Sequence, residues 1–385
     1  MQKRNKNITI LDITNSDPSS NLGGIESVVY NLNKELIRHG FKVVTISYSN
    51  LDFYKETDAG IIIGKKVPQN EILRVIVYPI KVLLEARKHN ADIIISEGPG
   101  NFGAGLLVNI FAKKHAIYLE RAHGTHYGLI KYTPKKSLHM QILGRLMANV
   151  IERFQFKLAN KCIAVSKLAE KELEQYFGIS KSNIMVIYNG VDCKEFKPVN
   201  DEDRGRLRRE LLIRKKCGVW VGGTDPYRKG LDIVLQIAKY MKNVEFKIIG
   251  SDKDFQSRYN LKIDINDLKN VEFLGKITNE EKIKYYHACD FLIFPSRHEG
   301  LAIAPMEALA CGLPVIVSDM TGVNEIISNG VEGFIVNNKK LESYIKAIAM
   351  INKSMGKRAR QLALKYDWKR QADIYAKWFR ELVDS

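Results

Sequence analysis

The chain alternates short apolar, β-branched segments with amphipathic stretches of helical length, and this alternation occurs in two successive series. Short apolar runs of this kind are typical of parallel strands that are buried on both faces and connected by helices. The first series predicts strands at residues 8–14, 42–47, 91–96, 116–120, 162–166 and 184–192. The pattern therefore predicts an α/β domain with helices on both faces of a parallel sheet.

The second series begins after a polar, basic interval at residues 197–216, with strands expected at 219–223, 245–250, 271–275, 291–295, 314–318 and 333–337. A length of 385 residues suits two domains of ordinary size. We predict Rossmann-like domains over 1–196 and 197–366, and an amphipathic C-terminal helix over 367–385 whose aromatic residues dock on a domain surface. Open α/β sheets bind ligands at the carboxyl ends of their strands, so a cleft between the two domains is the expected site.

The charge balance narrows the choice of partners. The formal net charge is +17, which favours nucleotides, nucleic acid or an anionic membrane surface without choosing among them. No apolar run reaches the roughly 20 residues that span a bilayer, and the N-terminus lacks the apolar segment of a signal peptide, so we expect a cytoplasmic protein. The five cysteines are scattered, which predicts reduced, buried thiols, and the histidines show no metal-ligand spacing.

Two loops of the first series carry candidate site residues. Gly23 and Gly24 open a helix after the first strand, where bare backbone N–H groups suit a phosphate, although a plain turn is the alternative. His123 and His126 lie in a glycine-flanked loop after residues 116–120, and either a catalytic or a structural histidine fits this position. The glycines do not form a GxGxxG motif, which disfavours a dehydrogenase.

The first loop of the second series carries adjacent cations. Gly222 lies at the end of the expected strand, and Arg228 and Lys229 precede Gly230 and a helical run. Cations at the start of a helix beside a strand end are well placed to bind a diphosphate. The alternative interpretation is an ordinary solvated start of a helix.

The stretch HEGLAIAPMEALACG contains two glutamates, Glu299 and Glu307, eight positions apart. We expect Glu299 in a loop and Glu307 in the first turn of a helix, both facing one cleft, with Pro305 in the same turn. Two carboxylates can each bind vicinal hydroxyls, while the intervening amides bind phosphates, so the spacing fits a nucleotide sugar. The alternative is one loop acid and one glutamate that suits the helix dipole. The amides in question belong to Gly300, Leu301, Ala302 and Ile303.

This stretch resembles the Glu-x7-Glu motif of the retaining glycosyltransferases of family 4, which have the two-domain GT-B fold. The segments GGIE at 23–26, HG at 123–124 and DWKRQA at 367–372 are similar to further motifs of that family. The resemblance implies that Glu307 binds the nucleotide ribose, that Glu299 lies beside the transferred sugar, and that a basic pair binds the diphosphate. Family members often carry an arginine where this chain has Gly223, so we expect Arg228 to replace it, as in a subgroup that includes lipopolysaccharide-core glucosyltransferases.

The resemblance implies a retaining transferase that moves a hexose from a nucleoside-diphosphate sugar to a hydroxyl of a glycan or lipid-linked acceptor in cell-envelope synthesis. We expect no metal or other cofactor, because Arg228, Lys229 and backbone amides can stabilise the leaving diphosphate. His123 would then orient the donor sugar or stabilise the transition state. The DxD sequence at Asp252 and Asp254 is interpreted as a surface turn.

Residues 131–161 mix cations with apolar positions at helical spacing, which predicts either a core helix with a solvated basic face or a peripheral contact with an anionic membrane. Two rival functions remain at this point. One is a nucleotide-sugar-binding protein without turnover, and the other is a nucleic-acid-binding Rossmann protein. The charge is spread over the sequence rather than gathered with aromatic residues, so we expect no nucleic acid partner.

Overall fold

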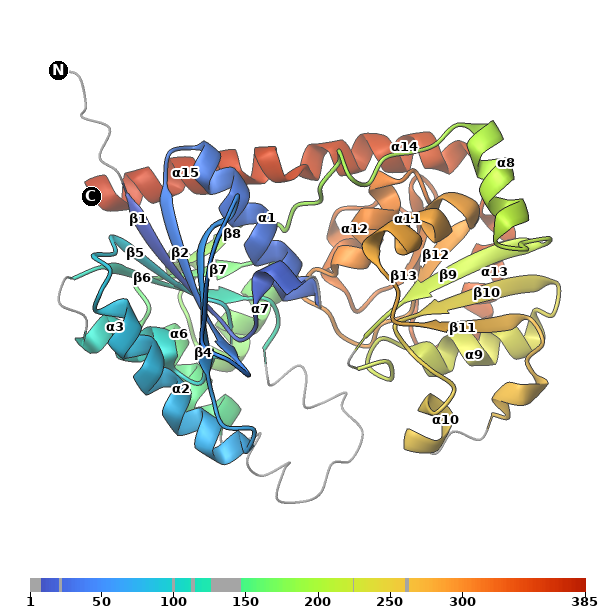
Figure 1. Ribbon diagram of the computed structural model, residues 1–385. Coiled ribbons are helices and arrows are strands. Elements are labelled where there is room, and N and C mark those ends of the chain that lie inside the picture. Colours follow the sequence, from blue (N-terminus) through green and yellow to red (C-terminus); the bar gives the residue numbers. More distant parts are fainter. Residues whose placement is uncertain are drawn as a thin grey trace. The chain divides into compact units, whose positions relative to one another are not determined.

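Two sheets with helices packed on their faces make up the computed structural model (Figure 1). The structure describes residues 8–20, 23–98, 101–111, 115–125, 147–223, 225–259 and 263–385. The first unit contains the described residues up to 125, residues 147–190 and Trp368–Ser385, and the second contains Val191–Asp367. The chain therefore passes from the first unit to the second after Gly190, where residue 196 was the expected boundary, and it returns to the first unit at Trp368.

The first unit has an eight-stranded sheet in the order β3-β4-β2-β1-β5-β6-β7-β8. Its neighbouring strands are parallel except for the antiparallel pair β3–β4. All six strands expected from the sequence are present, with shifted ends. The strands are β1 (Thr9–Thr14), β2 (Lys42–Ser49), β3 (Phe53–Thr57), β4 (Gly60–Lys66), β5 (Ile93–Ser96), β6 (Ile117–Ala122), β7 (Lys161–Ala164) and β8 (Ile184–Val186).

The β3–β4 hairpin was not expected from the sequence, which predicted parallel strands alone. β3 lies at the edge of the sheet and is largely exposed, so it lacks the apolar run that marked the other strands. Its turn closes at Gly60, whose φ of 94° lies in the region that favours glycine. The ring of Phe53 covers Gly64 so closely that a Cβ at Gly64 would overlap it.

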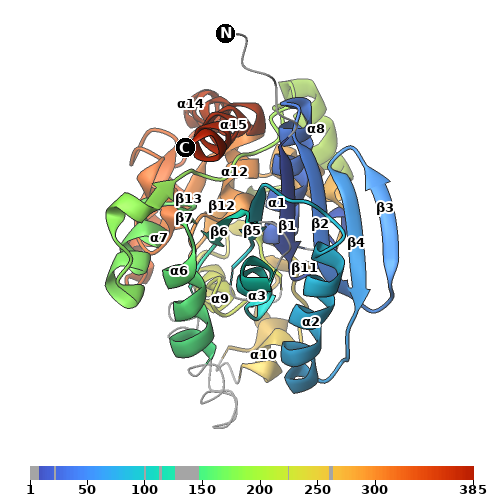
Figure 2. The same ribbon diagram turned by 90° about the vertical axis from the view of Figure 1, so that its left-hand side faces the viewer.

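The helices of the first unit lie on two faces because parallel crossovers are right-handed. The chain moves one way across the sheet from β1 to β2 and the other way from β4 through β5 and β6 to β7. Accordingly α1 (Gly24–Arg38) packs against α15 (Trp368–Asp384). On the other face α3 (Ala104–Phe111) packs against both α2 (Glu71–Ala86) and α6 (Arg153–Leu158), as Figure 2 shows. The π-helical segment η3 (Met147–Glu152) leads into α6, and α7 (Lys167–Glu172) follows β7.

The C-terminal helix α15 is amphipathic, as the sequence predicted. Its aromatic residues Trp368, Tyr375 and Phe379 are buried, and Phe379 makes an edge contact with Phe41. The ring of Trp368 lies over Gly190, where a Cβ would overlap it. The helix thus completes the core of the first unit.

The second unit has a six-stranded parallel sheet in the order β11-β10-β9-β12-β13-β14. Trp220, Phe246 and Phe291 are among the large side chains of its core. The strands are β9 (Lys216–Val221), β10 (Val244–Ile249), β11 (Val271–Gly275), β12 (Phe291–Phe294), β13 (Val315–Ser318) and β14 (Gly333–Val336). The helices are α8 (Asp201–Glu210), α9 (Leu231–Tyr240), α10 (Phe255–Arg258), α11 (Asn279–Ala288), α12 (Ile303–Ala310), α13 (Leu341–Met350) and α14 (Ser354–Ala363).

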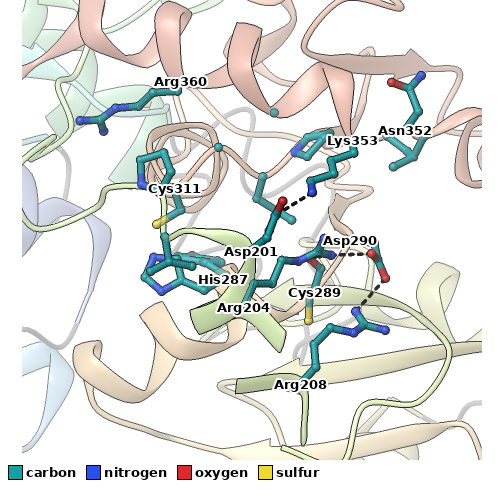
Figure 3. Close-up of a pocket in the computed structure, with 18 of the residues that line it drawn as sticks. Asp201, Arg204, Arg208, His287, Cys289, Asp290, Cys311, Asn352, Lys353 and Arg360 are labelled. Atoms are coloured by element: carbon teal, nitrogen blue, oxygen red, sulfur yellow. Dashed lines mark hydrogen bonds and ion pairs between the residues drawn. The ribbon is translucent and has the colours of Figure 1, made fainter. Parts of the chain in front are cut away.

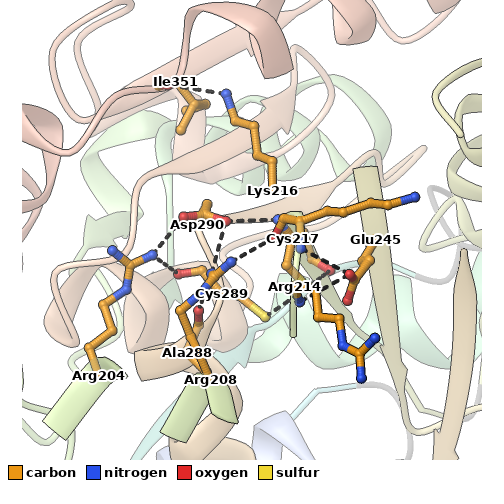
Figure 4. A network of polar contacts seen from close by, with 12 residues as sticks. Arg204, Arg208, Arg214, Lys216, Cys217, Glu245, Ala288, Cys289, Asp290 and Ile351 are labelled. Carbon is orange, nitrogen blue, oxygen red and sulfur yellow. Dashed lines mark hydrogen bonds and ion pairs between the residues drawn. The ribbon is translucent and has the colours of Figure 1, made fainter. Parts of the chain in front are cut away.

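The polar interval at 197–216 contains a helix. α8 occupies Asp201–Glu210, and the side chain of Asn200 caps it by accepting a hydrogen bond from the Asp203 N–H at 2.7 Å. Arg204 and Arg208 of this helix form ion pairs with Asp290, the residue before β12 (Figure 4). These basic residues therefore hold α8 against the segment that precedes β12.

All five cysteines are buried free thiols, as their scattered positions predicted. The sulfur atoms of Cys217, in β9, and Cys289, at the end of α11, are 3.5 Å apart.

Candidate functional site

The loops that follow β9 and β12 lie together because these two strands are neighbours in the sheet. The Arg297 N–H donates a hydrogen bond to the Arg228 carbonyl at 2.7 Å, and the Ser296 hydroxyl donates to the same oxygen at 3.2 Å. Gly230 has a φ of 74°, and a Cβ there would overlap the carbonyl of Pro295. Glycine at 230 therefore lets the two loops approach, and it caps α9.

Arg228, Lys229 and Glu299 form one charged cluster in these loops. Nη1 of Arg228 lies 2.7 Å from Oε1 of Glu299, and Nζ of Lys229 lies 3.9 Å from the same oxygen. Arg228 also pairs with Asp225 at 3.2 Å and donates to the His298 carbonyl at 2.7 Å. Burial alone would raise the pKa of Glu299, but the two cations outweigh it and hold that pKa below its usual value. The structure thus brings together three of the residues singled out in the sequence, with Glu299 ionised.

Residues before and within the start of α12 are placed as expected. Leu301 and Ala302 are buried, Ala302 is the extended N-cap, and Ile303 is the first helical residue. The first N–H groups of a helix have no partner within it and lie at the positive end of its dipole. Pro305 lies in the first turn, and the helix stops before Gly312, whose φ is 74°. Gly300 is buried in the loop that leads to this turn.

Glu307 lies one turn further into α12 than the sequence analysis placed it. The helix begins at Ile303, so Glu307 falls in the second turn, and its side chain is buried. Its carboxylate accepts hydrogen bonds from Nζ of Lys282 at 2.9 Å and from the Tyr286 hydroxyl at 2.8 Å, both on α11. A carboxylate oxygen can accept a second hydrogen bond, so ribose hydroxyls would share Glu307 with these two residues. Neither Lys282 nor Tyr286 was foreseen, because their contact with Glu307 joins separate helices.

Gly222 directly follows β9, as expected. Its N–H donates to the Ile249 carbonyl at 3.0 Å, and a Cβ at this position would overlap the ring of Trp220. Asp252 of the DxD sequence is exposed and pairs with Arg258 at 2.7 Å, which suits the interpretation as a surface turn.

In the first unit, Gly23 caps α1 and Gly24 is its first residue, as the glycine pair predicted. The carboxylate of Glu26, however, folds back over this end of the helix. A Cβ on Gly23 would overlap Glu26, and Glu26 accepts a hydrogen bond from the Ser16 hydroxyl. A phosphate at Gly23 and Gly24 would meet this negative charge, so the arrangement favours binding of hydroxyl groups there.

His123 belongs to a buried polar cluster that the sequence analysis did not identify. Its Nε2 atom lies 2.6 Å from Oε2 of Glu97, and Nη1 of Arg121 lies 2.7 Å from Oε1 of the same carboxylate. Asp12 of β1 is buried beside them and accepts a hydrogen bond from the Asn33 amide at 2.9 Å. Glu97 follows β5, and β1, β5 and β6 are neighbours in the sheet, so the topology assembles the cluster. His126 lies outside the described residues.

The charges of this cluster balance when one carboxyl group keeps its proton. Burial, followed by the neighbouring Glu97, raises the pKa of Asp12 well above its usual value. Burial also raises the pKa of Glu97, but the Arg121 guanidinium opposes that rise. Burial and then Arg121 lower the pKa of His123 to about 3. We therefore assign a protonated Asp12, an ionised Glu97, a cationic Arg121 and a neutral His123. The Nε2–H of His123 then donates to Glu97, which leaves Nδ1 as a hydrogen-bond acceptor.

A cavity of about 810 Å³ lies at the other end of the second sheet, beside Lys216 and Pro314 at the starts of β9 and β13 (Figure 3). Arg204 and Arg208 on its wall form ion pairs with Asp290, and Lys353 pairs with Asp201 at 2.6 Å. Parallel sheets of this kind bind ligands at the carboxyl ends of their strands. This cavity lies at the opposite ends of the strands, so we do not take it as the candidate site. Its ion pairs join α8 to Asp290, before β12, and to Lys353, before α14.

Comparison with known proteins agrees with this geometry. The family model described as "Glycosyltransferase Family 4" matches residues 22–195, and the model described as "Glycosyl transferases group 1" matches residues 204–364. An uncharacterized glycosyltransferase of Methanocaldococcus jannaschii is 28% identical over 94% of this chain and 96% of its own length. The N,N'-diacetylbacillosaminyl-diphospho-undecaprenol alpha-1,3-N-acetylgalactosaminyltransferase of Campylobacter jejuni is 27% identical over 63% of this chain and 65% of its own.

The crystal structure of Anabaena HepE in complex with UDP and glucose superposes with a TM-score of 0.76 at 19% identity, covering 97% of this chain and all of that one. The two family models match one unit each and leave only short segments unmatched. The chain therefore belongs to the family 4 (group 1) glycosyltransferases and has the GT-B fold.

Proposed function

We propose that the protein is a retaining hexosyltransferase, which transfers a sugar from a nucleoside-diphosphate sugar to a hydroxyl of a glycan or lipid-linked acceptor in cell-envelope synthesis. The cluster of Arg228, Lys229 and Glu299 at the carboxyl end of the second sheet carries this proposal. It presents two cations and an ionised carboxylate close to the amino end of a helix, which is the chemistry that a sugar diphosphate requires.

Two similar proteins support this choice of substrates. The relative from Campylobacter jejuni is named for a lipid-linked acceptor, diphospho-undecaprenol, and for an alpha-1,3 transfer. Anabaena HepE was solved with UDP and glucose. The first name supplies a lipid-linked acceptor and the second a nucleoside diphosphate with a sugar, and we extend both to this chain as part of the proposal.

In this proposal the second unit holds the donor. Arg228, Lys229 and the first amides of α12 neutralise the charge that grows on the diphosphate as its bond to the sugar breaks, and no metal is required. Glu299 accepts hydrogen bonds from hydroxyls of the transferred sugar. Glu307 accepts hydrogen bonds from the ribose hydroxyls, while Lys282 and Tyr286 hold its carboxylate in place.

Retention follows if the acceptor attacks from the face that the diphosphate leaves. The acceptor oxygen forms a bond to the anomeric carbon, the bond from that carbon to the phosphate oxygen breaks, and the acceptor proton passes to the departing phosphate. The first unit receives the acceptor. The neutral His123 offers Nδ1 to a sugar hydroxyl, and Glu26 is placed to bind another. The enzyme works in the cytoplasm or at the cytoplasmic surface of the membrane.

The test is turnover with a panel of nucleotide sugars, measured as release of the nucleoside diphosphate with and without acceptor. We expect one donor to be hydrolysed slowly without acceptor, and Arg228→Ala to reduce that rate strongly while the protein stays folded. Tight donor binding without hydrolysis or transfer under any condition would instead support a nucleotide-sugar-binding protein. Equal rates for wild type and Arg228→Ala would remove this cluster from the reaction.

A further inference from the structure

Exposed apolar side chains gather on one part of the first unit. Of the sixteen large hydrophobic side chains that are exposed in the described part of the chain, nine belong to α2, α3, η3 and α6. The remaining seven are distributed over other elements of both units. We call these nine the apolar face: Leu73, Ile76, Ile80, Leu84, Ile110, Phe111, Val150, Phe154 and Leu158.

The four members on α2 form a continuous stripe because they recur every three or four residues. Their side chains are 49–58% exposed, whereas Tyr78 and Val82 on the opposite side of the helix are fully buried in the core. A surface helix of a soluble domain ordinarily turns a polar side to water. α2 instead has one apolar side that packs in the core and a second apolar side that is exposed.

The other members extend the stripe sideways. α3 packs against both α2 and α6, so the three helices form one layer on the same face of the sheet (Figure 2). Val150, Phe154 and Leu158 recur every fourth residue along η3 and α6, and Ile110 and Phe111 end α3. The guanidinium of Arg87 donates to the Phe111 carbonyl at 3.2 Å and ties the end of α2 to α3. An apolar surface of this extent marks a contact site.

The exposed charged side chains that the structure describes on or next to these helices are cations. Arg87, Lys88, Arg153 and Lys157 are exposed on or next to these helices. Their carboxylate neighbours Glu85 and Glu152 are buried, and Glu85 is engaged by Lys65 at 2.6 Å and by Lys88 at 2.8 Å. The surface therefore combines apolar side chains with cations at their edges.

We propose that the apolar face docks on an anionic lipid bilayer, with its apolar side chains among the acyl chains and its cations at the headgroups. No helix in the described residues combines the length and the hydropathy needed to cross a bilayer, so the contact is peripheral. A second copy of the chain fits this face less well, since a symmetric dimer would bring the two sets of cations together.

Docking on a bilayer would bring the enzyme to a lipid-linked acceptor, and this consequence rests on the proposed function. It also changes the surface expected from the sequence. Residues 131–146 of the predicted membrane segment lie outside the described residues, including Lys135, Lys136 and Arg145. Val150 and Phe154 of that segment are exposed, and the structure adds α2 and α3 to them.

The test is co-sedimentation of the full chain with vesicles that contain phosphatidylglycerol and with vesicles of phosphatidylcholine alone. The variant Ile80→Asp/Phe154→Asp removes two apolar contacts and adds two negative charges. Its matched control is Tyr240→Asp/Met350→Asp, at positions in the second unit that are at least as exposed as Ile80 and Phe154. We expect wild type and control to bind the anionic vesicles, the test variant to bind at least about tenfold more weakly, and salt to weaken binding.

Equal binding of the test variant and wild type to anionic vesicles would overturn the proposal, as would equally tight binding of wild type to neutral vesicles. Sedimentation velocity tests the alternative that a second copy of the chain covers the apolar face. A wild-type dimer that the test variant converts to a monomer would assign the face to a second copy. Donor hydrolysis without vesicles is measured in parallel and should be the same in all three proteins. Absence of hydrolysis in all of them would count against the proposed function while leaving vesicle binding intact.

Discussion

Nε2 of His123 lies 2.6 Å from one oxygen of Glu97, and the other oxygen of that carboxylate lies 2.7 Å from Nη1 of Arg121. A single buried carboxylate thus binds a guanidinium and fixes the orientation of an imidazole. The guanidinium also lies over the ring of Tyr375 in α15, 5.1 Å from its centroid. The C-terminal helix therefore supports the histidine loop through Arg121.

The cluster contains one cation, Arg121, and two carboxyl groups, Glu97 and Asp12, and this leads to a prediction about stability. Arg121→Met removes the cation and leaves Glu97 buried beside Asp12, so the free energy of unfolding should fall by about 3–5 kcal/mol. Glu97→Gln should cost clearly less, because Asp12 can release its proton and balance Arg121. Urea denaturation of the two variants measures both values. Equal losses would contradict the assignment of a protonated Asp12.

The low pKa of His123 predicts a pH dependence of stability. Its pKa in the folded protein is about 3, against 6.5 as the reference value, so the unfolded chain binds the additional proton between these limits. The contribution of His123 to stability is complete above pH 6.5 and is lost as the pH falls toward 3. The stability of wild type should therefore fall more steeply than that of His123→Gln over this window. Parallel curves from urea denaturation at several pH values would show that His123 titrates normally.

Glu307 leads to a prediction about nucleotide binding. Glu307→Gln keeps the shape of the side chain but removes the charge from two hydrogen bonds to the ribose, each worth about 1.5–3 kcal/mol. The affinity for the free nucleoside diphosphate should drop about tenfold or more in isothermal titration calorimetry. Tyr286→Phe removes one hydrogen bond to Glu307 and should weaken binding less. An unchanged affinity in Glu307→Gln would exclude Glu307 from the nucleotide site.

Arg228 leads to a prediction about rate. The negative charge on the leaving phosphate grows toward the transition state, so Arg228→Ala should lower kcat by about 100-fold and raise the donor KM much less. Lys229→Ala should show the same pattern with a smaller loss, because Lys229 is less firmly held in the cluster. Its Nζ lies 3.9 Å from Oε1 of Glu299, whereas Nη1 of Arg228 lies 2.7 Å from that oxygen. Steady-state kinetics separates the two constants. A raised KM with unchanged kcat would mean that Arg228 binds the donor equally well in the ground state and transition state.

Much of the fold could be predicted because the residues that specify each strand and each end of a helix are close together in the sequence. Buried parallel strands require β-branched apolar runs, and the twelve expected strands are all present. The helix starts at Gly23 and Gly230 and the stop before Gly312 follow from glycine and proline positions near one another in the sequence. The strands β3 and β4 were both missed. β3 is exposed and carries no such run, and the run in β4 is only three isoleucines long between two glycines.

The site could be predicted only where its residues are close in sequence or follow neighbouring strands. Arg228 and Glu299 were expected together because each follows a strand of the second series, and the pairing of β9 with β12 brings them into contact. Glu97 and Lys282 were missed because their partners, His123 and Glu307, lie on other elements. Glu26 was missed for a different reason. It belongs to the glycine segment GGIE, but the sequence does not show that its side chain folds back over Gly23.

The stereochemistry of the product tests most directly whether the enzyme is a retaining transferase. Once the donor and acceptor are known, proton NMR of the first product formed, in the presence of a metal chelator, gives the anomeric configuration of the new linkage. For a metal-independent retaining transferase, the new linkage should have the configuration of the donor sugar, and the rate should be unaffected by the chelator. An inverted linkage, or a reaction that stops without divalent metal, would contradict transfer supported by Arg228, Lys229 and Glu299.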